Sequence, residues 1–186
     1  MDAVLKMLME KVKRVYTRKS ENTQMLKWIW LALLVVIVDQ LTKYIASNSL
    51  TMFQPVAVMP MFNWTLMHNT GAAFSFLADQ AGWQRWFFSI VAVVVSVVIF
   101  VWIKRLQQHE KWQAIALALI LGGAVGNVID RIWLGYVVDF IQVYYEQWYW
   151  PAFNIADSAI SIGVVIIIIE SIREYKEERK SNKSEK

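Results

Sequence analysis

Two stretches of the chain, residues 86–103 and 112–129, each run for 18 positions without a charged side chain. As helices they would be roughly 27 Å long at about 1.5 Å per residue, close to the thickness of a bilayer's hydrocarbon core. The 186-residue chain is 57% hydrophobic and 18% charged, against roughly 25% charged residues in an average soluble domain. A soluble domain of this size cannot enclose several such helices, so the sequence predicts an integral membrane protein.

Two more hydrophobic segments bring the predicted number of transmembrane helices to four. The first, Trp28–Ser47, carries Asp39 and Lys43, and the last is Ile155–Glu170. Because the first segment contains two charges and further spans follow it, we expect it to remain as a span and not to be removed as a signal peptide.

The basic residues are distributed unequally between the two sides of these spans. Sixteen of the 19 Lys and Arg residues lie before the first span, in the short link after the second span, or after the fourth span. By the positive-inside rule both termini and this link are cytoplasmic. Basic residues beside spans favour anionic lipid over nucleic acid as their partner. The sixteen are Lys6, Lys11, Lys13, Arg14, Arg18, Lys19, Lys27, Lys104, Arg105, Lys111, Arg173, Lys176, Arg179, Lys180, Lys183 and Lys186.

The two long connections then face outward and have the patterns of a small folded cap. Residues Phe62–Leu66 alternate apolar and polar side chains, and Val137–Ile141 have strand propensity. Aromatic residues are dense in 82–88 and 136–150, as expected at a membrane interface. We predict a strand-containing extracytoplasmic cap; the alternative is an aromatic loop without regular structure. The predicted organisation is a charged N-terminal tail (1–25), a four-span unit (26–171) and a charged C-terminal tail (172–186).

Ionisable residues in and beside the spans gather toward the outer boundary, where each has a structural and a functional interpretation. A charge in the hydrocarbon costs at least about 2.5 kcal/mol. Asp39 and Lys43 could form an i,i+4 ion pair, and Asp157 could be an N-cap or first-turn acid. Asp139 has no obvious local partner, which favours function. The complete set is Asp39, Lys43, Asp130, Arg131, Asp139 and Asp157, with the amides Asn69, Asn127 and Asn154.

The chemistry open to this set is narrow. The chain has no Cys, which excludes disulfides, thiolate metal sites and a cysteine nucleophile. His68 and His109 are too far apart for a His-Glu-x-x-His zinc site, and no nucleophile elbow or phosphate-binding glycine loop occurs. Two carboxylates in a partly dry site can share one proton and activate water. The sequence therefore permits an aspartyl hydrolase that needs neither metal nor organic cofactor.

Five blocks of sequence resemble the signature segments of the bacterial lipoprotein signal peptidase family, signal peptidase II, and occur in the family's order. The resemblance covers residues 26–171. The blocks are Asp39-Gln40-Leu41-Thr42-Lys43, Asn69-Thr70-Gly71-Ala72-Ala73-Phe74, residues 122–131 (Gly122 to Arg131), Val137-Val138-Asp139-Phe140 and Phe153-Asn154-Ile155-Ala156-Asp157-Ser158.

The resemblance implies a four-helix inner-membrane aspartyl endopeptidase that cleaves lipidated prolipoproteins before the diacylglyceryl cysteine. It implies Asp139 and Asp157 as the catalytic pair, with Asp130 as the competing candidate, assigned to a supporting role. Membrane phospholipids are the other expected partners, and we expect a monomer. The supporting and substrate-binding residues implied are Asp39, Lys43, Asn69, Gly71, Asn127, Asp130, Arg131, Asn154 and Ala156.

Three other readings compete with this one. A small transporter would use its ionisable residues as an ion path, and would place them at several depths in the membrane. An assembly protein would use polar residues for helix association, which leaves Asp139 unexplained. A Ser–Lys protease could use Lys43 with Ser47, one helical turn later.

Overall fold

The structure, a computed structural model, describes residues 25–71 and 83–184. Four helices within these ranges are long and apolar enough to cross a membrane: Met25–Ser49, Arg85–Arg105, Lys111–Trp133 and Ile155–Glu177. Four membrane-capable helices match the predicted fold class.

The first span consists of a 3-10 turn, η1 (Met25–Trp28), that leads into helix α2 (Ile29–Ser49). It is followed by α3 (Trp83–Arg105), α4 (Lys111–Trp133) and α5 (Ile155–Ser184). Helices suit these apolar runs because every backbone N–H and C=O is bonded within the segment, as a membrane interior requires. Helix α5 passes without a break through the predicted boundary at 171/172, so the start of the predicted C-terminal tail is helical.

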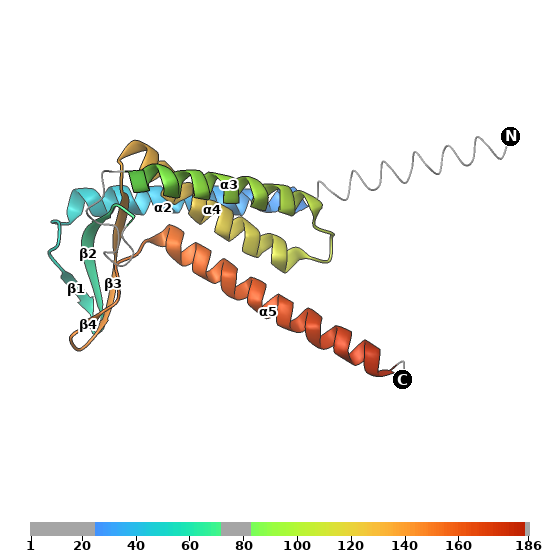
Figure 1. Ribbon diagram of the computed structural model, residues 1–186. Coiled ribbons are helices and arrows are strands. Elements are labelled where there is room, and N and C mark those ends of the chain that lie inside the picture. Colours follow the sequence, from blue (N-terminus) through green and yellow to red (C-terminus); the bar gives the residue numbers. More distant parts are fainter. Residues whose placement is uncertain (1–24, 72–82, 185–186) are drawn as a thin grey trace.

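Helix α4 is the central element of the bundle. It packs against α2, α3 and α5, and 61% of its most apolar window is buried, compared with 17–28% for the other three spans. Glycines allow the close approach, because a Cβ at Gly122 would lie 2.7 Å from the Ala32 carbonyl oxygen and 2.8 Å from the Val35 Cβ. In Figure 1, α4 runs beside α2 and α3, and α5 diverges from them toward the C-terminus.

A four-stranded antiparallel sheet of order β1-β2-β3-β4 lies at the end of the bundle where α5 begins (Figure 1). Its strands are β1 (Val56–Met59), β2 (Phe62–Asn69), β3 (Val137–Tyr145) and β4 (Trp148–Tyr149). The sheet confirms the strands predicted around 62–66 and 137–141 and extends both. The alternative of an irregular aromatic loop is wrong for these residues.

Strand β2 contains a β-bulge that changes which side chains face β3. Trp64 pairs with Ile141 and Met67 pairs with Asp139, so three steps along β2 match two steps along β3. A bulge of one extra residue exchanges the two faces of the strand beyond it. The odd-numbered residues of β2 after the bulge, Met67 and Asn69, therefore share the face of Asp139.

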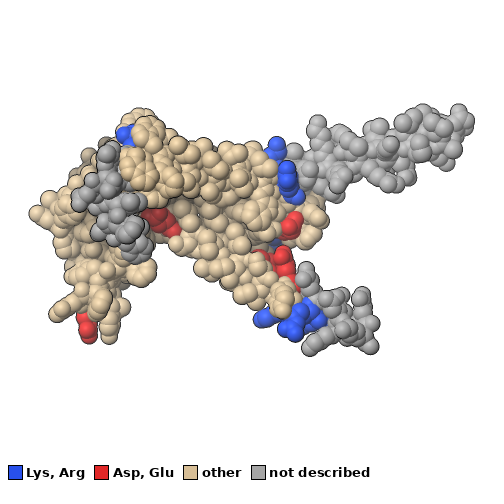
Figure 2. Space-filling view, in the orientation of Figure 1, with Lys and Arg blue, Asp and Glu red and all other residues tan. Residues whose placement is uncertain are grey.

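Most of the basic side chains gather at the end of the bundle opposite the sheet, and one basic group is visible near the sheet end (Figure 2). The surface between the two ends is almost entirely uncharged along the helices, apart from acidic atoms visible in a notch near the sheet (Figure 2). This arrangement leaves an uncharged belt of the kind that faces lipid.

We expect Gly122→Ala to lower the thermal stability of the protein in detergent. The added methyl group meets the α2 backbone, and overpacking of about 1–3 kcal/mol outweighs the roughly 1 kcal/mol that Ala gains over Gly in a helix. Val94→Leu adds one carbon on the exposed side of α3, where Val94 is 56% exposed, and should leave the melting temperature unchanged. Equal melting temperatures for wild type and Gly122→Ala would contradict the close α2–α4 packing.

Candidate active site

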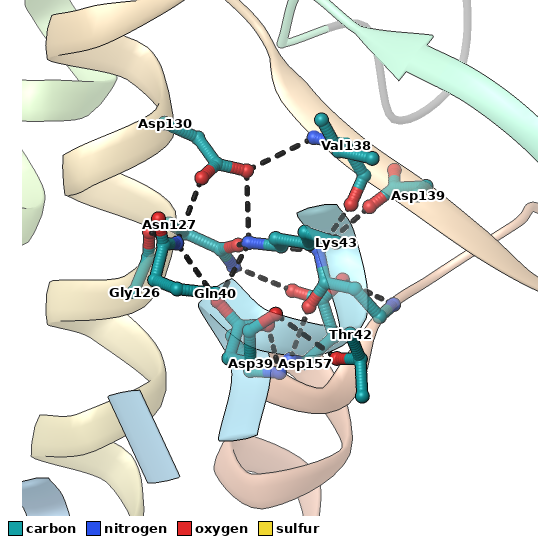
Figure 3. Close-up of polar contacts among 12 residues, drawn as sticks. Asp39, Gln40, Thr42, Lys43, Gly126, Asn127, Asp130, Val138, Asp139 and Asp157 are labelled. Atoms are coloured by element: carbon teal, nitrogen blue, oxygen red, sulfur yellow. Dashed lines mark hydrogen bonds and ion pairs between the residues drawn. The ribbon is translucent and has the colours of Figure 1, made fainter. Parts of the chain in front are cut away.

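A buried ion-pair cluster occupies the sheet end of the bundle (Figure 3). The Lys43 Nζ lies 2.8 Å from Asp39 Oδ2 and 2.9 Å from Asp130 Oδ2, and it donates to Asn127 Oδ1 at 2.9 Å. Asp39 is 0% exposed, and Lys43 and Asp130 are each 3% exposed. An ammonium group has three hydrogens, so these three acceptors use its full capacity. The predicted i,i+4 pair of Asp39 and Lys43 is confirmed, within a larger cluster.

Both acids of this cluster also hold backbone groups of other elements. Asp39 Oδ1 accepts from the Ala156 backbone N–H at 2.9 Å, in the first turn of α5. Asp130 Oδ2 accepts from the Val138 backbone N–H at 3.0 Å, at the start of β3. The cluster therefore ties α2, α4, α5 and β3 together at one point.

Asp130 has a further bond that the sequence analysis missed. Gln40 Nε2 donates to Asp130 Oδ1 at 2.8 Å, so both oxygens of this carboxylate are engaged. Gln40 adjoins Asp39 in the first sequence block, and this adjacency was the available signal. With Lys43, Gln40 and Val138 as partners, both oxygens of Asp130 are bonded within the protein.

Asp157 and Asn154 form a reciprocal cap at the start of α5. The Asp157 backbone N–H donates to Asn154 Oδ1 at 2.9 Å, and the Asn154 backbone N–H donates to Asp157 Oδ2 at 3.2 Å. This is the arrangement of a capping box, in which the N-cap and N3 residues satisfy each other's orphan donors. The N-terminus of a helix favours negative charge, so the environment of Asp157 suits a carboxylate. Asn154 is the N-cap, and Asp157 is a first-turn acid, as one of the two structural interpretations held.

Asp139 lies on β3, and its two carboxylate oxygens accept from amides of different elements. Asn69 Nδ2 donates to Oδ2 at 3.0 Å and Asn154 Nδ2 donates to Oδ1 at 2.7 Å. Burial, together with the charge of Asp157, raises the pKa of the Asp139 carboxyl to about 7, although the hydrogen bonds from Asn69 and Asn154 and the charge of Lys43 act in the opposite direction. Asn154 thus contacts both acids, and the two carboxyls lie in different environments.

The amide groups at the site are oriented by their other bonds. Asn127 Oδ1 accepts from Lys43, so its Nδ2 faces Asp157 Oδ1 and donates at 2.8 Å. The Gly71 backbone N–H donates to Asn69 Oδ1 at 2.9 Å, so the Asn69 Nδ2 faces Asp139. Gly71 has a positive φ of 108°, a conformation that favours glycine. Ala72, Ala73 and Phe74 of this block lie outside the described residues.

Arg131 does not accompany its neighbour Asp130. Within residues 25–71 and 83–184 its guanidinium makes no ion pair, and one bond to the Asn127 carbonyl oxygen is long, at 3.4 Å. The guanidinium carbon lies 5.7 Å from the centre of the Phe88 ring on α3, and the buried Nε has no bonding partner in that part of the chain. Arg131 therefore brings a charged group with unused donors to the α3 side of the site.

The structure brings the predicted site residues together at the sheet end, with Arg131 on the α3 side. Ala156 contributes its backbone N–H to Asp39. Gly71 contributes its backbone conformation and the N–H that orients Asn69. Within the described ranges there is no group of three or more His, Cys, Asp or Glu side chains that could hold a metal ion. The geometry offers two carboxyl groups in unlike environments, both bonded to Asn154 (Asp139 to its side-chain amide and Asp157 to its backbone N–H), beside a partly unsatisfied guanidinium.

Comparison with known proteins shows a similarity over most of the chain. A family model described as signal peptidase (SPase) II matches residues 31–173. The lipoprotein signal peptidase of Pseudomonas putida is 57% identical over 155 residues, covering 82% of this chain and 91% of that protein. The lipoprotein signal peptidase of Pseudomonas syringae pv. tomato is 55% identical over 162 residues, covering 86% and 94%.

Two solved structures share the fold. One, a bacterial membrane enzyme at 2.3 Å resolution, has a TM-score of 0.70 and 34% identity, covering 80% of this chain and 89% of that chain. The other, a bacterial membrane enzyme at 1.9 Å resolution, has a TM-score of 0.67 and 36% identity, covering 77% and 91%.

We expect Lys43→Met to destabilise the protein strongly, by about 3–5 kcal/mol, because it leaves Asp39 and Asp130 as uncompensated buried acids. The measurement is thermal or denaturant unfolding of the purified protein in detergent. Arg173→Met is the matched control: Arg173 pairs with Glu170 at 2.7 Å but is 63% exposed, so its loss should cost less than about 1 kcal/mol. Similar losses for the two variants would mean that the Lys43 cluster does not hold the bundle together.

Proposed function

Because the chain belongs to the signal peptidase II family of lipoprotein-processing proteases, we propose that it is a membrane aspartyl endopeptidase in which Asp139 and Asp157 activate water. Its proposed substrate is a prolipoprotein carrying a diacylglyceryl group on the cysteine after the scissile bond. The observation that carries the proposal is the pair of carboxyls bridged by Asn154. Asp157 is capped at a helix N-terminus, and the pKa of Asp139 is raised to about 7.

The different environments assign a role to each acid. Asp157, at the α5 N-terminus, takes a proton from water as the oxygen of that water bonds to the scissile carbonyl carbon. Asp139, which holds its proton up to about pH 7, gives that proton to the leaving nitrogen as the C–N bond breaks. The proton that Asp157 took from water then moves to Asp139, and both acids return to their starting protonation states.

The remaining polar residues divide between ordering the acids and holding the substrate. Asn69, Asn127 and Asn154 fix the positions of the two carboxyls through the bonds described above. Arg131 has donors left over for a substrate carbonyl. Asp39, Lys43 and Asp130 form the buried support, which sets the positions of β3 and α5.

The distribution of charge supports the proposed membrane orientation and location. Among the described residues the Lys43, Arg85 and Arg131 side chains belong to the sheet end, and the other basic residues belong to the opposite end. By the positive-inside rule both termini are cytoplasmic and the catalytic site faces outward. The proposed location is the bacterial inner membrane. The protein acts as a monomer among phospholipids, and the charged ends of the chain lie outside the catalytic unit.

The Ser–Lys reading fits the geometry poorly. Lys43 would have to act as a base toward Ser47, but its ammonium is bonded to Asp39, Asp130 and Asn127. These three contacts direct the Lys43 Nζ toward acceptors other than Ser47. A transport role is not favoured either, because among the described residues the buried ionisable groups form one cluster at the sheet end and no series along the spans.

We expect Asp139→Asn and Asp157→Asn to fold and to lose at least about 10²-fold in kcat/KM, the lower range for removal of a general acid or base. The measurement is cleavage of a diacylglyceryl-modified prolipoprotein by purified protein in detergent. Asp130→Asn is the comparison, and it should keep measurable activity if it remains folded. Activity retained by Asp139→Asn and lost by Asp130→Asn would move the catalytic pair to Asp130 and Asp157.

We expect the rate to fall above about pH 7, because deprotonation of Asp139 removes the general acid. The bond from Asn69 lowers the pKa of Asp139, so Asn69→Ala should shift this alkaline limb to higher pH. The measurement is kcat/KM between pH 5 and 9 for both proteins. A shift of the acid limb in place of the alkaline limb would reverse the roles of the two acids.

A further inference from the structure

Met67 is the residue on β2 that lies directly opposite Asp139. The two are paired in the antiparallel register of β2 and β3, and the side chains of paired residues point to the same face of a sheet with Cβ atoms about 4.5–5.5 Å apart. The bond from Asn69, two residues further along, to the Asp139 carboxylate shows independently which face this is. Met67 is therefore an apolar neighbour of the catalytic carboxyl, and neither the sequence blocks nor the mechanism above includes it.

The side chains beside Met67 point elsewhere. His68 lies on the opposite face, where it stacks on Tyr136 with ring centres 3.8 Å apart. Leu66 is buried, whereas Met67 is only partly buried. Of these three residues, Met67 alone presents a partly accessible apolar side chain on the face of Asp139.

The lipid on the proposed substrate determines which way the side chains on either side of the scissile bond point. The cysteine after the scissile bond carries two acyl chains, which must lie against the apolar helices. In an extended backbone successive side chains point in opposite directions. The side chain of the residue before the cysteine therefore points away from the helices and toward the sheet, where Met67 lies.

We propose that Met67 is a specificity-determining residue that limits the size of the substrate side chain immediately before the lipidated cysteine. This inference rests on the proposed peptidase function and deepens it. A flexible thioether side chain fills the space next to Asp139, so a small substrate residue fits beside it and a branched or large one does not. Shortening Met67 enlarges this space, and an aromatic ring in its place closes it.

The test is kcat/KM for a series of lipidated prolipoprotein substrates that differ only in the residue before the cysteine, with Gly, Ala, Val or Leu at that position. We expect wild type to prefer Gly and Ala. Met67→Ala should raise the Leu-to-Ala ratio of kcat/KM by about tenfold or more, as expected for a change of several carbons in an apolar pocket. Met67→Phe should lower the Ala-to-Gly ratio.

Two controls separate this inference from other causes. Met59→Ala makes the same substitution on β1, where Met59 is 59% exposed, and should leave the substrate ratios unchanged, as should the conservative Met67→Leu. If wild type cleaves the series but Met67→Ala keeps the wild-type ratios, the role of Met67 is overturned and the peptidase function stands. If well-folded wild type cleaves none of the substrates, both the proposed function and this inference are overturned.

Discussion

The rest of the site depends on the ion pairs and the hydrogen bond that the Lys43 ammonium group makes. A lysine buried to this extent is stable as a cation only when its partners compensate for the lost hydration, and Asp39, Asp130 and Asn127 do so. Each partner also forms a hydrogen bond with another element. Asp39 accepts from the α5 backbone, Asp130 accepts from the β3 backbone, and Asn127 donates to the Asp157 carboxylate. The two proposed catalytic carboxyls belong to β3 and α5, and the charge of Lys43 adds to the Ile141–Phe153 backbone pairing and the Asn154 bonds that hold these elements together.

The two acids differ because one is at a helix terminus and the other is on a strand. A helix N-terminus supplies backbone donors and a favourable dipole, whereas a buried strand residue has only the side chains that reach it. Asn154 participates in both environments, as the N-cap of α5 and as a donor to Asp139. The same side chain therefore couples the position of Asp157 to that of Asp139, and a displacement of α5 changes both.

The sequence predicted what depends on local spacing and missed what depends on long-range pairing. Four spans followed from uncharged runs, and the Asp39–Lys43 pair followed from a separation of four residues. Asp139 was judged to lack a partner because Asn69 and Asn154 lie 70 and 15 residues away. The bulge in β2 left no clear signal, since Thr65 and Leu66 are ordinary strand residues, yet it alone decides that Asn69 and Met67 reach Asp139. Helix α5 continues to Ser184, beyond the predicted span that ends near Glu170, and its polar part has no Pro or Gly to end it.

The pairing of Asp39 with Lys43 one turn away on the same helix has a consequence for biogenesis. The first span enters the bilayer before α4 and α5 have been synthesised, so Asp130, Asn127 and the Ala156 backbone are not yet present to receive its charges. Each charge alone would cost about 2.5–3.5 kcal/mol on insertion. As an i,i+4 pair, Asp39 and Lys43 enter the bilayer with no net charge. The translocon can therefore release the helix into lipid before the polar groups of the later spans are present. The third and fourth spans then have a preformed polar target that selects their rotational setting as they arrive.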